Sequence, residues 1–110
     1  MAMLSAEKDA VISMKVSSII PDFLFSSDKE NHAAPFFEDS KIFSGTTRSQ
    51  DYPILYYPNG AIYLGWVSAY KEHESFYTKN FAVFPMPESR SVDIDTKEDF
   101  LLAQALLSLI

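Results

Sequence analysis

The stretch Tyr57-Pro-Asn-Gly-Ala-Ile-Tyr63 carries more structural information than any other part of this 110-residue sequence. It lies within residues 52–66, a run of aromatic and β-branched side chains that is typical of β-strands. Asn and Gly both tolerate positive φ, so Asn59-Gly60 between two apolar runs predicts the turn of a β-hairpin. In an alternative, functional interpretation, Asn59 presents its amide to a polar ligand, and Tyr63 offers a hydroxyl nearby.

Two further strands are predicted around this stretch. Residues 10–16 (Ala-Val-Ile-Ser-Met-Lys-Val) and residues 81–84 (Phe-Ala-Val-Phe) are both rich in apolar and β-branched side chains. Residues 1–9 are interpreted as the end of a helix, and a helix that leads into a buried strand is typical of entry into the middle of a βαβ fold. The predicted fold class is therefore α/β.

Two helices complete the predicted pattern. A short helix is expected over residues 66–74 and a closing helix over residues 97–109. Thr96 and Asp99 are three residues apart, and their hydroxyl and carboxylate resemble a capping box at the start of the closing helix. The apolar residues of that helix recur with helical spacing and form one face: Leu102, Ala105, Leu106 and Leu109.

Residues 17–50 differ in character from the rest of the chain. Two prolines, a charged run over residues 28–30 and many Ser and Thr residues predict an extended segment with little regular structure. The segment nevertheless carries many large apolar side chains: Phe23, Leu24, Phe25, Phe36, Phe37, Ile42 and Phe43. It packs either on its own domain or on another subunit, and large apolar patches on an irregular arm favour the interface.

Composition limits the classes of function. The chain has the length of one small domain or of a piece of a larger one. A hydrophobic content of 47% excludes a disordered tail. A net charge of −6 argues against a nucleic-acid partner and against adhesion to an anionic membrane. There is no cysteine, so disulfides and a cysteine nucleophile are excluded.

Targeting signals are not predicted. No apolar stretch approaches the roughly 20 residues that a membrane-spanning helix needs. The first ten residues lack the basic region and apolar run of a signal peptide, so a cytoplasmic location is expected.

Asp93 and Asp95 are the candidate metal ligands. In an extended segment, residues two apart point to the same side, so these two carboxylates would both face a hard cation such as Mg²⁺. In the alternative interpretation, Asp95 or Thr96 caps the final helix while Asp93 lies in solvent. His32 and His73 are isolated in the sequence and are predicted to be surface residues rather than metal ligands.

Two other pairs are candidate binding residues. Phe76 and Tyr77 would form an apolar wall against a substrate, or else would belong to the core. Arg48 lies beside Gln50 and would clamp a carboxylate with its guanidinium, or else would be a solvated surface residue.

The order of these motifs resembles the C-terminal half of the acylneuraminate cytidylyltransferases, the enzymes that synthesise CMP-sialic and related CMP-nonulosonic acids. The resemblance covers nearly all of the chain. It is carried by Arg48-Ser-Gln50, Asn59-Gly-Ala-Ile-Tyr63, Phe76-Tyr77 and Ser91-Val-Asp-Ile-Asp-Thr96, followed by the final helix. The segments Asn59-Gly-Ala-Ile-Tyr63 and Ser91-Val-Asp-Ile-Asp-Thr96 are the most specific of these.

The resemblance implies a Rossmann-like nucleotidyltransferase fold with an extended dimerisation arm. Residues 20–58 would be the arm, and residues 59–110 would be the part that binds the sugar and the metal. It also implies a reaction in which CMP passes from CTP to a nonulosonic acid and pyrophosphate is released. Asn59 and Tyr63 would line the sugar pocket with Phe76 and Tyr77 as its wall, and Asp93 and Asp95 would be catalytic residues that bind Mg²⁺.

The sequence departs from the family in three respects. The family has a basic residue where this chain has Ser49, and some members have a lysine near the position of Phe25. The glycine- and lysine-rich phosphate loop of the family's N-terminal half has no counterpart in these 110 residues. The CTP-binding half is therefore expected to be absent, and this chain alone is expected to turn over CTP negligibly.

Two alternatives to an enzyme stand beside this interpretation. The chain would be a non-catalytic module that dimerises through its apolar arm. Otherwise it would be a degenerate remnant, which would be unstable or poorly expressed.

Overall fold

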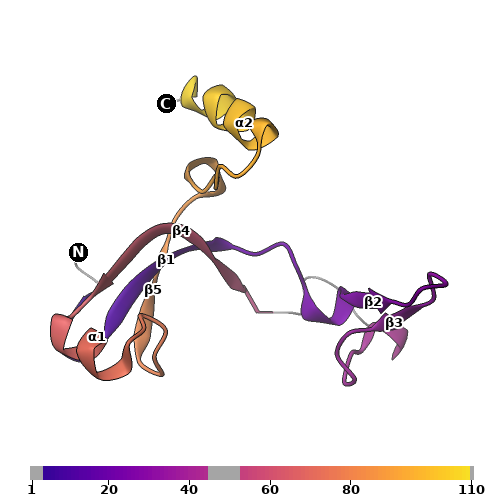
Figure 1. Cartoon of the computed structure of the whole chain (residues 1–110), viewed down its shortest axis with the longest axis horizontal. Helices are drawn as coiled ribbons and strands as arrows, with labels where there is room; N and C mark the ends of the chain where they lie inside the picture. Colours follow the sequence, from indigo (N-terminus) through magenta and orange to yellow (C-terminus); the bar gives the residue numbers. More distant parts are fainter. Residues whose placement is uncertain (1–3, 45–52, 110) are drawn as a thin grey trace. The chain divides into compact units, whose positions relative to one another are not determined.

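The computed structural model describes residues 4–44 and 53–109 of the chain. It divides into two compact units, one made of Met1–Val16 with Tyr56–Ile110 and the other of Ser17–Leu55. The larger unit contains the sheet and both α-helices, and the smaller one contains a short hairpin (Figure 1). The content is therefore α/β, as predicted.

A mixed three-stranded sheet organises the larger unit. Strand β1 (Ala10–Val16) lies in its centre, antiparallel to β4 (Tyr56–Gly65) and parallel to β5 (Phe81–Pro85). The strands predicted over residues 10–16 and 81–84 are thus confirmed. The buried apolar core lies on the central strand because this strand has neighbours on both edges; it comprises Ala10, Val11, Ile12 and Met14.

The pairing of β1 with β4 is interrupted by a large bulge. Ile12 pairs with Tyr63 and Met14 pairs with Pro58, so residues 59–62 of β4 face the single residue Ser13. The predicted hairpin turn at Asn59-Gly60 is therefore wrong, because both sides of this dipeptide pair with the same strand. Gly60 has a φ of 76°, which lets the backbone turn locally without leaving the sheet.

The two helices agree closely with prediction. Helix α1 (Val67–His73) begins after Trp66 and ends at Glu74, whose φ of 55° is the left-handed conformation common at helix ends. A short 3₁₀ turn (Glu88–Arg90) follows β5, and α2 spans Lys97–Leu107. The predicted capping box of α2 is confirmed: the Thr96 hydroxyl accepts from the Asp99 N–H, and the Asp99 carboxylate accepts from the Thr96 N–H.

The N-terminal segment is not helical. Residues 4–9 contain turns and bends only, so the helix end predicted for residues 1–9 is wrong in its described part. The reason is tertiary. The Asp9 N–H donates to the Asn80 carbonyl at 2.8 Å, and the Asp9 carbonyl accepts from the Trp66 N–H at 3.2 Å. These contacts with distant segments satisfy backbone groups that a helix would otherwise use.

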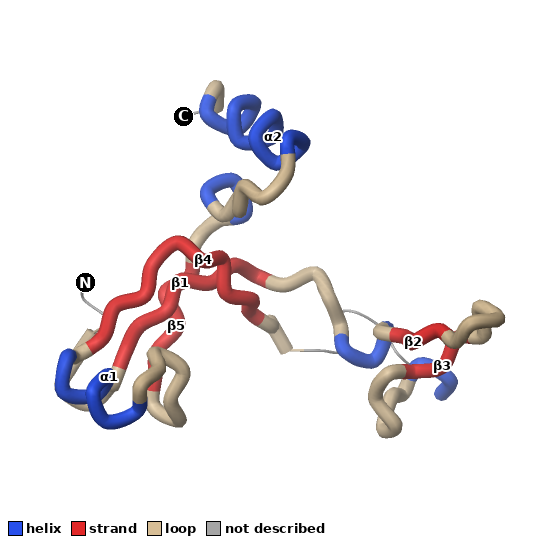
Figure 2. Tube along the Cα trace, viewed as in Figure 1, coloured by secondary structure: helices blue, strands red, loops and turns tan. Residues whose placement is uncertain are grey.

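The smaller unit has little regular structure, as predicted for this region. It contains two single 3₁₀ turns (Pro21–Phe23 and Ile42–Ser44) and an antiparallel hairpin of β2 (Phe25–Ser27) and β3 (Ala33–Pro35), drawn in red in Figure 2. The hairpin turn is closed by Asp28, whose carboxylate accepts the backbone N–H groups of residues 30 and 32 at 2.9 and 3.0 Å. Across the described ranges, no helix is long and apolar enough to cross a membrane.

Candidate functional site

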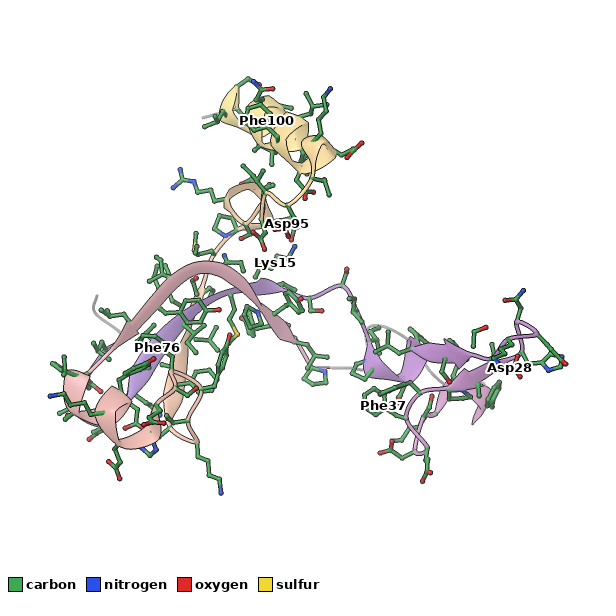
Figure 3. The ribbon with its side chains drawn as sticks, viewed as in Figure 1. Lys15, Asp28, Phe37, Phe76, Asp95 and Phe100 are labelled. Carbon is green, nitrogen blue, oxygen red and sulfur yellow. The ribbon has the colours of Figure 1, made fainter. Side chains whose placement is uncertain are left out.

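A pocket of about 230 Å³ lies where β1 and the β4 bulge meet the segment that leads into α2. Its lining comprises Lys15, Tyr57, Pro58, Asn59, Glu88, Ser91, Val92, Asp93, Asp99 and Leu102. It brings together two of the predicted site residues, Asn59 and Asp93, which are far apart in the sequence. Figure 3 labels Lys15 on β1 and Asp95 in the segment before α2.

The charges around this pocket are mostly negative. Glu88, Asp93 and Asp99 contribute carboxylates, and among the described residues of the lining Lys15 is the one cation. The Lys15 ammonium lies 3.1 Å from a Glu88 carboxylate oxygen, and this glutamate is well exposed. An exposed pair of this kind is weakly held, so the lysine can exchange partners at low cost.

Asp93 and Asp95 have different surroundings. The Asp93 side chain lines the pocket, whereas Asp95 does not belong to the lining. The backbone N–H of Asp95 donates to the Asp99 carboxylate at 3.0 Å, and both aspartates of the pair are exposed. Neither aspartate caps the helix with its own side chain, because Thr96 does so.

Asp99 is a residue that sequence reasoning assigned only to the helix cap. Its carboxylate accepts from the N–H groups of Asp95 and Thr96, both at 3.0 Å, and its own N–H donates to the Thr96 hydroxyl at 3.1 Å. The hydrogen bonds from the Asp95 N–H and from Thr96 lower the pKa of the Asp99 carboxyl, since they favour its charged form. Asp99 therefore holds the backbone at Asp95, one of the two candidate metal ligands.

Asn59 is almost fully buried, with 8% of its surface exposed. Its Oδ1 accepts from the Ser13 hydroxyl at 2.6 Å and from the Ala61 N–H at 3.2 Å. Its Nδ2 donates to the Ser91 hydroxyl at 3.0 Å and lies 3.4 Å from the Met86 sulfur. The Asn59 side chain thus forms part of the pocket wall while its polar atoms bond to protein groups.

Three of the predicted sugar-pocket residues form an aromatic cluster. The Tyr63 ring lies 5.6 Å from the Phe76 ring and 6.0 Å from the Tyr77 ring. Tyr70 and Phe81 extend the cluster through contacts with Phe76 and Tyr77 respectively. These centroid distances are typical of favourable aromatic pairs. The structure therefore places five of the predicted residues in two groups: Asn59 and Asp93 in the pocket, and Tyr63, Phe76 and Tyr77 in this aromatic cluster.

The hydroxyls of Tyr63 and Tyr77 lie 3.1 Å apart. This hydrogen bond, followed by desolvation, raises the pKa of the Tyr77 phenol above its ordinary value of 10.0. Both rings are partly exposed, so the paired hydroxyls are accessible to solvent and to a polar ligand.

The remaining predicted residues are less informative. Arg48 and Gln50 lie outside the described residues. His73 Nε2 lies 3.7 Å from the Asp9 carboxylate, and His32 is exposed near Asp28 and Glu30. Among the described residues, no group of three or more His, Asp and Glu side chains is arranged to hold a metal ion.

Two residues of the site were missed by sequence reasoning. Ser13 is fully buried and Lys15 lines the pocket, and both belong to β1. The signal for Ser13 was its position as the one polar residue among the apolar side chains at residues 10–14. A hydroxyl in such a strand must find buried hydrogen-bond partners.

Curated proteins of known activity are similar to this chain, although no protein-family model matches it. It is 31% identical over 97 residues to an N-acylneuraminate cytidylyltransferase of Streptococcus agalactiae serotype V; this segment covers 88% of the chain and 22% of that protein. It is 39% identical over 70 residues to a CMP-N,N'-diacetyllegionaminic acid synthase of Campylobacter jejuni, covering 64% of the chain and 29% of that protein.

The resemblance predicted from the motifs is therefore confirmed as a distant similarity. A second Streptococcus agalactiae cytidylyltransferase, of serotype III, is 41% identical over 54 residues, or 13% of its length. The chain spans less than a third of each of these three proteins.

Proposed function

We propose that this chain supplies the sugar-binding and metal-binding part of a cytidylyltransferase that acts on a nonulosonic acid. In the reaction, the anomeric hydroxyl oxygen of the sugar forms a bond to the α-phosphorus of CTP, and the bond from that phosphorus to pyrophosphate breaks. The observation that carries the proposal is the similarity to an N-acylneuraminate cytidylyltransferase over 88% of the chain.

The aromatic cluster supports a role in binding the sugar acid. The rings of Tyr63, Phe76 and Tyr77 provide apolar surface for the acyl group and the sugar ring, and two hydroxyls lie at its edge. Sites for small polar ligands commonly combine an aromatic wall with a few placed polar groups. Arg48 and Gln50 are proposed to contact the sugar carboxylate, and Ser49 leaves Arg48 without a basic neighbour.

Asp93 and Asp95 are proposed to hold Mg²⁺. The donor set fits, because Mg²⁺ is commonly held by one or two carboxylates together with substrate phosphates rather than by a complete protein cage. Both carboxylates are exposed, and the Asp99 carboxylate holds the backbone at Asp95. When bound, Mg²⁺ would neutralise charge on the triphosphate and on the departing pyrophosphate.

Residues outside these 110 are proposed to bind the triphosphate. No glycine-rich phosphate loop occurs in the sequence, and Lys15 is the one cation that the described part of the chain brings to the pocket. Positioning and charge neutralisation provide most of the catalysis in phosphoryl-type transfers. The purified chain with CTP, Mg²⁺ and N-acetylneuraminic acid is therefore expected to release no measurable pyrophosphate; release that is lost in Asp95→Ala would contradict this.

The first experiment is a titration of the full chain with N-acetylneuraminic acid, followed by NMR. We expect the ring resonances of Tyr63, Phe76 and Tyr77 to shift at millimolar sugar. The matched control ligand is the methyl ester of the same sugar, which keeps its shape and loses its charge, and we expect it to bind more weakly. Absence of shifts with either ligand, in a chain whose β1 amides remain protected, would contradict the assignment of this cluster to the sugar.

A non-catalytic association module is the second candidate function. It is favoured by the large apolar side chains that the smaller unit exposes, including Phe25, Phe36 and Phe43. In either function, residues 20–58 are proposed to form a homodimer interface. Dimerisation together with sugar binding would favour the enzyme part, whereas dimerisation without any affinity for sugar or CTP would favour the module.

A further inference from the structure

We infer that Asn59 is a positioning residue whose amide, held between Ser13 and Ser91, fixes the segment that carries Asp93. In this role Asn59 contributes no hydrogen bond to a ligand. The inference departs from the sequence-based assignment of the Asn59 amide to sugar binding. Its consequence for catalysis rests on the proposed function, whereas the hydrogen-bond network itself does not.

The protons of this network have defined positions. The Ile62 backbone N–H can only donate, and it points to the Ser13 oxygen at 2.8 Å. The Ser13 hydroxyl donates its own proton onward to Asn59 Oδ1, which can only accept, at 2.6 Å. At the other end, the Pro87 carbonyl can only accept, so the Ser91 hydroxyl donates to it at 2.7 Å. The Ser91 oxygen is then left to accept from Asn59 Nδ2 at 3.0 Å.

This order fixes the orientation of the Asn59 amide. A flipped amide would place Nδ2 against the Ala61 N–H, which is 3.2 Å from Oδ1, and two donors would face each other. Both lone pairs of Oδ1 and both protons of Nδ2 are engaged by Ser13, Ala61, Ser91 and the Met86 sulfur. A carbonyl oxygen and an amino group of this kind have no further capacity for a ligand.

The network joins three segments that are distant in sequence. Ser13 belongs to β1, Asn59 to the bulge of β4, and Ser91 to the end of the 3₁₀ turn after β5. All three are buried, with 0%, 8% and 6% of their surfaces exposed. Asp93 follows Ser91 by two residues, so the anchoring of Ser91 sets where its carboxylate enters the pocket.

Burial gives these bonds their strength. Hydrogen bonds shielded from water are electrostatically stronger, and an unpaired polar group at the same place is costly. No buried side-chain nitrogen or oxygen in the described part of the chain lacks a partner. Removal of one hydroxyl would therefore leave its neighbours unpaired and would loosen the segment that starts at residue 91.

The test compares Ser91→Thr with Ser91→Val in the full chain. The two replacement side chains have nearly the same shape, and only threonine retains the hydroxyl. We expect Val to raise the mobility of the backbone at residues 92–94, measured by ¹⁵N relaxation, and Thr to restore wild-type values. Ser89→Ala, an exposed position in the same turn, is the matched control and should change nothing. Equal mobility in the Thr and Val variants would overturn the inference.

A second measurement needs no variant. In the wild-type chain, we expect the side-chain amide protons of Asn59 to exchange with solvent at least about tenfold more slowly than those of Asn31, because only the former are buried in hydrogen bonds. Equal exchange rates would overturn the inference even if Ser91→Val fails to fold. Neither measurement uses nucleotide or sugar, so a failure here is distinguishable from a failure of the proposed function.

Discussion

At the scale of single residues, Asn59-Gly60 shows how one dipeptide can serve two local structures. Its preference for positive φ is real, since Gly60 adopts a φ of 76°. That preference alone does not separate a hairpin turn from a bulge, because both can use a glycine at positive φ. The choice between turn and bulge depends on Ser13 of β1. Its hydroxyl accepts from the Ile62 N–H and donates to Asn59 Oδ1, and these bonds hold the extra residues within one strand.

Gly60 provides the first prediction at this scale. We expect Gly60→Ala to destabilise the chain by about 1–2 kcal/mol, since a side chain is disfavoured at positive φ. A Cβ atom at this position meets nothing within 4 Å, so the loss is conformational and not steric. The matched variant is Gly60→Asn, which tolerates this conformation better and should lose less. Urea unfolding measures both; an equal loss in the two variants would argue against the bulge geometry.

The tyrosine pair gives a prediction about titration. We expect Tyr63→Phe to lower the pKa of Tyr77 toward its ordinary value of 10.0, because the hydrogen bond between the two hydroxyls is the largest cause of its elevation. Tyr70→Phe is the control, since Tyr70 contacts Phe76 in the same cluster. The ¹³C shift of the Tyr77 phenol carbon reports each titration. A pKa that Tyr63→Phe leaves unchanged would contradict the pairing.

At the scale of elements, α2 illustrates a helix that is specified at its start. Thr96 and Asp99 satisfy backbone N–H groups that no helical carbonyl can reach. None of the side chains of this helix is buried, so tertiary packing contributes little to the stability of α2. Local capping thus accounts for the agreement between the predicted and observed start of the helix at Lys97.

The cap makes the stability of α2 dependent on pH. The folded-state pKa of Asp99 lies below its ordinary value of 3.8, so its stabilising contribution is complete above that pH and is lost as the pH falls through the folded-state pKa. We expect the helical shifts of α2 to weaken in acid below pH 3.8. Asp99→Asn should remove this dependence, measured by NMR from pH 6 downward. Glu98→Gln, in the same turn, is the control; an equal effect of both variants would contradict the cap.

At the scale of the whole chain, apolar exposure is the dominant feature. The buried apolar core consists of four residues of β1, while large side chains on the smaller unit and on α2 remain accessible in the described structure. A patch of this kind marks a surface that another chain segment or subunit covers. This exposure is the physical basis of the proposed dimer interface. Within the single chain, Phe36 packs edge-to-face on the adjacent Phe37 at 5.0 Å.

The proposed dimer gives the prediction at this scale. Phe36 is 65% exposed in the single chain, and burial of a phenylalanine contributes about 1.5–3 kcal/mol. We therefore expect Phe36→Ser to raise the dimer dissociation constant at least about tenfold in sedimentation equilibrium. Val67→Ser is the matched control, since Val67 is 70% exposed on α1, outside the arm. A monomeric wild-type chain, or an equal effect of both variants, would contradict the arm interface.

Prediction of the site from sequence had a clear limit. The similarity to cytidylyltransferases was visible in ordered motifs, and so were the residues that each motif contributes. Their grouping was not visible, because Asp93 and Asn59 meet in one pocket while Tyr63, Phe76 and Tyr77 cluster together. Lys15 was missed because a lysine near the end of a strand carries no spacing signal.

The amino-acid sequence was enough to predict the parallel strands β1 and β5, both α-helices and the capping box, because side-chain period and capping are local properties. The path of residues 4–9 and the bulge at Asn59 could not be predicted locally, since both depend on hydrogen bonds to residues more than 30 positions away. The role of Asn59 follows the same rule. Its chemistry is evident from its residue type, but its partners Ser13 and Ser91 are brought to it only by the folded sheet.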